Sequence, residues 1–107
     1  MQKQESFMRN GYKVFWTPNA LKELDDTIEY LKRNFSDKEI VKLAKKIENF
    51  TQIVSQNPRV FPRSEHKNIH KAVILRLNTV YYRIHEETVE IVSFFSNRQS
   101  PSKIDFE

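Results

Sequence analysis

The sequence contains no cysteine and only one glycine in 107 residues. Without cysteine, a disulfide framework, a thiolate metal site and a cysteine nucleophile are all excluded. With Gly11 as the only glycine, no glycine-rich loop can cradle a nucleotide cofactor. No apolar run approaches the ~20 residues needed to cross a bilayer. We therefore expect a protein that suits the reducing cytoplasm, uses no cofactor and does not insert into membranes.

The remaining composition describes one small basic domain. Eight Phe, four Tyr and one Trp supply the apolar area that a single core needs in a chain of this length. The formal net charge is +4. Positive charge is concentrated in residues 59–76, where five Lys or Arg and two His face one acid, Glu65. Such a patch suits nucleic acid or an acidic protein partner, and charge alone does not choose between them.

Residues 1–11 are polar and lack the apolar core of a signal peptide, so we expect a flexible tail followed by a single domain over residues 12–107. Residues 12–16 are rich in aromatic and β-branched side chains, which predicts a strand. Thr17 and Pro18 then form a helix start signal, a capping residue followed by proline in the first turn.

Two amphipathic helices follow this start signal. In both, apolar residues recur with the spacing 3, 4, 3, 4, which places them on one helical face. These residues are Leu21, Leu24, Ile28, Leu31 and Phe35 in the first helix, and Ile40, Leu43, Ile47, Phe50 and Val54 in the second. Ser36 and Glu39 match a capping box between the helices, and Pro58 ends the second one. The short joint predicts an antiparallel helical hairpin.

The rest of the chain alternates in the manner of β-strands. We expect strands over residues 69–77, 80–85 and 88–95, with turns at Asn78-Thr79 and Glu86-Glu87. The order β-α-α-β-β-β predicts an α+β fold, in which an antiparallel sheet is covered on one face by the helical hairpin.

Strand periodicity predicts which side chains the helices leave uncovered. One set is apolar and should face the helices: Val73, Leu75, Leu77, Val80, Tyr82 and Ile84. The other should lie on the open face: His70, Arg76, Tyr81, Arg83 and His85. Guanidinium, imidazole and phenol groups suit phosphate contact and base stacking, and they also suit metal-free RNA cleavage. For each residue taken alone, a solvated polar side chain is the competing interpretation.

A metal site is not expected. His66 and His70 are four residues apart, but this spacing pairs metal ligands only on a helix, and here a loop enters a strand. No Asp or Glu stands at a position in the sequence that would complete such a site.

Several motifs together resemble the ParE/RelE toxin superfamily of bacterial type II toxin–antitoxin modules, whose members include plasmid stabilisation proteins. The resemblance covers about residues 12–104. It rests on the helix start at residues 17–21, the helical hairpin, Asn57-Pro58, Tyr81-Tyr82-Arg83-Ile84, and the closing segment Phe94–Pro101. It implies a small growth-inhibiting toxin that is neutralised by an acidic antitoxin, which wraps the toxin with a helix and a strand.

The resemblance implies two alternative targets. RelE-like members cut mRNA on the ribosome, whereas ParE-like members bind DNA gyrase and cut nothing. The nucleases commonly place an arginine where this chain has Asn78-Thr79, and a tyrosine or histidine where it has Gln99-Ser100-Pro101. The incomplete set and the long hairpin favour a ParE-like toxin, with ribosome-dependent cleavage as the alternative and a toxin fold without toxicity as a third.

Each alternative has its own candidate residues. For target binding they are His70, Lys71, Arg76, Tyr81, Arg83 and Arg98. For cleavage they are Arg76, Arg83, Tyr81, His85 and Arg98. Arg98, in the closing motif, is the position that the resemblance transfers most directly, and a salt-bridged structural role is an equal alternative for it.

Overall fold

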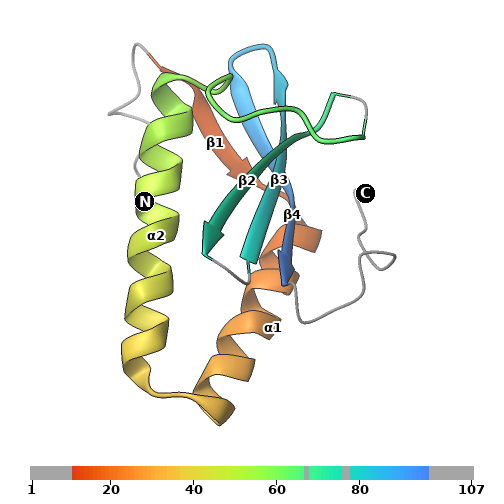
Figure 1. Ribbon diagram of the computed structural model, residues 1–107. Coiled ribbons are helices and arrows are strands. Elements are labelled where there is room, and N and C mark those ends of the chain that lie inside the picture. Colours follow the sequence, from red (N-terminus) through yellow and green to blue (C-terminus); the bar gives the residue numbers. More distant parts are fainter. Residues whose placement is uncertain (1–10, 67, 76–77, 97–107) are drawn as a thin grey trace.

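The computed structural model describes residues 11–66, 68–75 and 78–96. Most of the predicted tail, together with Arg76 and Arg98, lies outside these residues. The elements (Figure 1) follow in the order β1 (Lys13–Trp16), α1 (Pro18–Asn34), α2 (Asp37–Gln56), β2 (His70–Leu75), β3 (Asn78–His85) and β4 (Thr88–Ser96).

The first helix begins where the sequence predicts. The side-chain oxygen of Thr17 accepts a hydrogen bond from the Ala20 amide at 3.2 Å, and Pro18 occupies the first turn. The capping box predicted for the second helix is wrong, because the Ser36 side chain makes no capping hydrogen bond. Instead the Glu39 amide donates to the Ser36 carbonyl oxygen at 3.1 Å, a backbone contact that replaces the side-chain cap.

The predicted α+β fold is confirmed, with one difference in the sheet. The strand order is β1-β4-β3-β2. As predicted, β3 is antiparallel to both β2 and β4, whereas β1 runs parallel to β4. Parallel neighbours require a long crossover connection, and both helices lie in the chain between β1 and the other strands. The sheet is therefore mixed.

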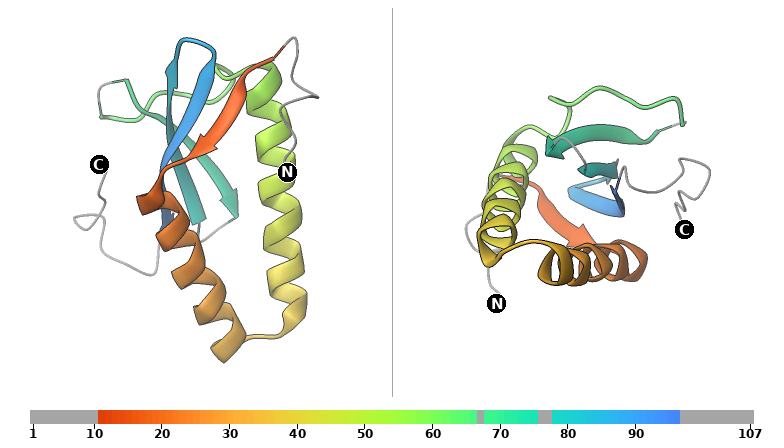
Figure 2. Two further views of the ribbon diagram at one scale, coloured as in Figure 1. Left: turned by 180° about the vertical axis from the view of Figure 1, so that it is seen from behind. Right: turned by 60° about the horizontal axis from the view of Figure 1, so that its bottom comes forward.

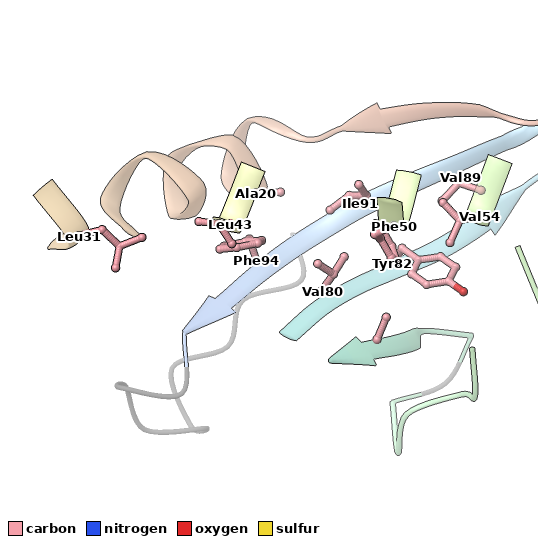
Figure 3. Packing of buried hydrophobic residues seen from close by; sticks show 11 residues of the cluster. Ala20, Leu31, Leu43, Phe50, Val54, Val80, Tyr82, Val89, Ile91 and Phe94 are labelled. Atoms are coloured by element: carbon pink, nitrogen blue, oxygen red, sulfur yellow. The ribbon is translucent and has the colours of Figure 1, made fainter. Parts of the chain in front are cut away.

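Both helices pack against the same face of the sheet (Figure 2). They form a V whose apex projects beyond the ends of the strands (Figure 1). Residues from both helices and from β2, β3 and β4 make one core (Figure 3). Its buried members are Ala20, Leu31, Leu43, Phe50, Val54, Ala72, Val80, Tyr82, Val89, Ile91 and Phe94. No helix in the described part of the chain is long and apolar enough to span a membrane.

The predicted faces of β3 are correct, but those of β2 are wrong. Val73, expected in the core, is 62% exposed, whereas its neighbour Ala72, which the same alternation turns away from the core, is 1% exposed. The cause is a register shift between Val73 and Leu75, where the chain adds a residue against β3. Leu75 packs against the core as predicted. Because the prediction assumed simple alternation along the whole strand, the residues before the shift face the side opposite to the predicted one.

The predicted turn at Asn78-Thr79 is also wrong. Both residues belong to β3 and are buried, so the connection between β2 and β3 falls earlier in the chain. The turn at Glu86-Glu87 is confirmed, and Glu86 has a positive φ of 54°, as a tight two-residue hairpin turn requires.

Candidate functional site

His70 does not lie on the open face of the sheet. Its cross-strand partner is Tyr82, so both side chains point towards the helices. The two rings stack, with centroids 5.2 Å apart and planes 14° apart. The Nδ1 atom of His70 lies 2.9 Å from the carbonyl oxygen of Phe61. Because a carbonyl only accepts, Nδ1 carries the proton, and the ring is fixed in one tautomer.

Tyr81 is on the face away from the helices, as predicted, but it is not open to solvent. It belongs to a second apolar cluster with Ile69, Val92 and Phe95, and only 8% of the residue is exposed. Burial, with a smaller contribution from the charge of Glu65, raises the pKa of the Tyr81 phenol. A phenol that is harder to ionise is a poorer general base near neutral pH.

Lys71 is the cross-strand neighbour of Tyr81 and shares its face, and it is half-buried. Arg83 lies on that face as well, opposite Glu90 of β4. The Nε atom of Arg83 donates to Oε1 of Glu90 at 2.5 Å. The Arg83 side chain remains 42% exposed, so the ion pair orients the guanidinium without covering it.

A hollow of about 450 Å³ brings three of the predicted residues together at the edge of the sheet. It is lined by Arg59, Arg63, Asn68, His70, Arg83, Ile84 and His85. His70, Arg83 and His85 are the predicted members, and they meet at the edge because β2 begins at His70, opposite Tyr82, while β3 continues to His85. Arg76 and Arg98 are outside the described residues.

Two arginines of this hollow, Arg59 and Arg63, are missing from the residues predicted for the site. They lie in the loop between α2 and β2, and Arg63 forms a β-bridge with His70 that carries the loop alongside the sheet. The concentration of bases in residues 59–76 was the signal for them, but strand periodicity cannot place a loop. The arginines of this arrangement can bind anions. Proton transfer is less well provided for, because His85 is the only exposed residue among the described proton-transfer candidates.

No cluster of three His, Asp or Glu residues that could hold a metal ion occurs within residues 11–66, 68–75 and 78–96.

Comparison with solved structures places this fold among small toxins. A chain from the chromosomal ParDE system of P. aeruginosa superposes with a TM-score of 0.68 at 16% identity, covering 79% of this chain and 95% of its own. The YoeB dimer from Staphylococcus aureus gives a TM-score of 0.54 at 18% identity, with coverages of 78% and 94%. YafQ–DinJ, a toxin–antitoxin complex from E. coli, gives 0.55 at 9% identity, with coverages of 81% and 93%. At these identities the likeness establishes the fold alone.

The family follows from the sequence itself. The family model described as the ParE toxin of the type II toxin–antitoxin system, parDE, matches residues 14–101. No curated protein has a significant match. The chain belongs to the ParE toxin family, which confirms the resemblance drawn from its motifs.

Proposed function

We propose that this toxin acts by binding DNA gyrase, cuts no RNA, and is neutralised by a cognate antitoxin. The observation that carries the choice of target is the start of β3. Nucleases of the superfamily commonly place an arginine there, whereas this chain has Asn78 and Thr79, which are 3% and 5% exposed. Neither side chain is cationic, so the first residues of β3 offer no positive charge that could stabilise a phosphorus centre during cleavage.

The described proton-transfer candidates support the same choice. The His70 ring is packed on Tyr82 and bound to the Phe61 carbonyl, and the Tyr81 phenol is buried with a raised pKa. Arg83 is engaged by Glu90. Cleavage of RNA without a metal needs a base and an acid that reach the substrate together, and only His85 of this set is exposed.

The antitoxin is supported by the relatives and by charge. The solved neighbours include the YoeB–YefM complex from Staphylococcus aureus and the DinJ–YafQ complex from E. coli. This chain carries a formal net charge of +4, which favours an acidic partner. A short acidic reading frame beside the gene would encode it.

Induced expression in bacteria separates the alternatives. A gyrase inhibitor should stop growth and activate a DNA-damage reporter while mapped transcripts stay intact. Co-expression of the adjacent acidic reading frame should restore growth. Ribosome-dependent cuts within coding sequences would instead establish the RelE-like activity, and Arg83→Ala would then be expected to weaken them. Normal growth on induction without the antitoxin would overturn both activities.

A further inference from the structure

The hollow at the edge of the sheet exists because the neighbouring strands β2 and β3 differ in length. Pairing of β2 with β3 begins at His70 and Tyr82, so the last three residues of β3 extend past the start of β2. The loop before β2 closes the other side. Its backbone is tied to the strand by hydrogen bonds from the Lys71 amide to the Pro62 carbonyl at 2.9 Å and from the Ser64 amide to the Ile69 carbonyl at 2.7 Å. The walls are therefore built from paired backbone.

Among the described residues, the lining of the hollow is cationic and contains no acid. Three arginines and two histidines contribute to it, from the loop, from β2 and from the end of β3. Within the described part of the chain, Arg59 and Arg63 have no carboxylate within ion-pair distance. Glu90 contacts the Nε atom of Arg83 and is not among the lining residues. The hollow therefore holds positive charge that the described chain does not neutralise.

A guanidinium group can donate two parallel hydrogen bonds to either a carboxylate or a phosphate. A phosphate monoester carries about −1.5 to −2 charges near neutral pH and three acceptor oxygens, so it can engage more than one guanidinium at a time and suits a lining with several arginines better. The volume of about 450 Å³ exceeds what a single phosphate ion fills and lies within the range of small-ligand pockets. Ile84 supplies an apolar contact, and Asn68, held in a left-handed conformation with φ of 62°, supplies an amide. A phosphate group attached to a larger organic molecule fits this combination of charged, polar and apolar contacts.

We propose that this hollow is a binding pocket for a phosphate monoester of nucleotide size, with Arg59 and Arg63 as its principal ligands. His70, Arg83 and His85 form the remaining polar wall. The pocket is independent of the gyrase target, because its assignment rests on the lining residues alone and its test measures binding of a small molecule.

Isothermal titration of the full-length chain with a nucleoside 5′-monophosphate, inorganic phosphate and the unphosphorylated nucleoside tests this assignment. The first two should bind and the nucleoside should not. Binding of the nucleotide more tightly than phosphate would place the nucleoside in the pocket, and equal affinity would make the phosphate group the whole ligand; both support phosphate recognition. Absence of binding by both anions, or equal binding of the nucleoside, would overturn it.

A pair of matched variants shows where binding occurs. Arg59→Gln combined with Arg63→Gln removes two exposed charges that have no partner among the described residues, so the fold should be retained. This variant should weaken binding at least about tenfold, since hydrogen bonds to charged groups are the strong ones. Lys45→Gln combined with Lys46→Gln removes the same charge from the exposed surface of α2 and should change affinity less than about twofold. Equal losses in both variants would show diffuse attraction and would overturn the pocket.

Discussion

Replacing Tyr82 by alanine should remove a large share of the free energy of unfolding. Tyr82 is fully buried, and its ring packs against Phe50, Phe61 and His70 at centroid distances of 5.7, 6.4 and 5.2 Å. Deleting a buried aromatic side chain typically costs about 3–5 kcal/mol. Since small domains have a total stability of about 5–15 kcal/mol, this loss consumes much of it. Urea denaturation followed by circular dichroism measures the change.

Tyr82→Phe separates the ring from its hydroxyl. The hydroxyl donates to the Pro58 carbonyl oxygen at 2.6 Å, so the phenylalanine variant keeps the ring contacts and leaves one buried acceptor unpaired. The expected loss is about 1–3 kcal/mol. An alanine variant within about 1 kcal/mol of the wild type would contradict the central place of this ring in the core.

The same comparison predicts a pH dependence. Burial raises the pKa of Tyr82 to about 12, whereas tyrosines of the unfolded chain ionise near pH 10. The stability that depends on the neutral phenol is therefore fully present below about pH 10 and is lost as the pH rises towards 12. Tyr82→Phe should lose less stability than the wild type over this interval.

The second large effect is expected at Glu23, a carboxylate that joins α1 to β4. Its Oε1 atom accepts hydrogen bonds from the Ser93 hydroxyl and the Phe94 amide, both at 2.9 Å. The register shift in β4 lies at this point, between the partners of Tyr81 and Tyr82. Ser93 is completely buried, so Glu23→Ala leaves donors without a partner and without water. The expected loss is about 2–6 kcal/mol, at roughly 1–3 kcal/mol for each of the two unsatisfied donors.

Glu29→Ala is the matched control for Glu23 because it changes the same residue type on the same helix. Glu29 is 59% exposed and lies 3.9 Å from Lys32, a surface pair that should contribute less than about 1 kcal/mol. Glu23→Gln retains an accepting oxygen and should fall between the two. If Glu23→Ala and Glu29→Ala were equally stable in urea, the carboxylate would have no structural role at the register shift.

The sequence predicts most of the fold because its signals are local. The cap at Thr17 and the 3, 4, 3, 4 spacing depend only on neighbouring residues, and both helices appear where these signals place them. The faces of β2 could not be predicted in the same way. One extra residue between Val73 and Leu75 reverses the alternation, and no residue type in that stretch marks the shift.

The candidate site shows the same limit. Alternation correctly placed Tyr81 and Arg83 away from the helices, but it could not show that Tyr81 is buried in a second apolar cluster. Arg59 and Arg63 reach the hollow only because their loop pairs with the start of β2, a tertiary contact without a periodic signal. Their charge density was visible in the sequence, whereas their position was not.

A supercoiling assay with purified gyrase measures the proposed activity of this toxin itself. We expect the toxin to block ATP-dependent supercoiling of a relaxed plasmid and the purified antitoxin to reverse the block. At the same toxin concentration, mRNA on purified ribosomes should stay intact. Unimpaired supercoiling together with cleaved mRNA would contradict the proposed activity.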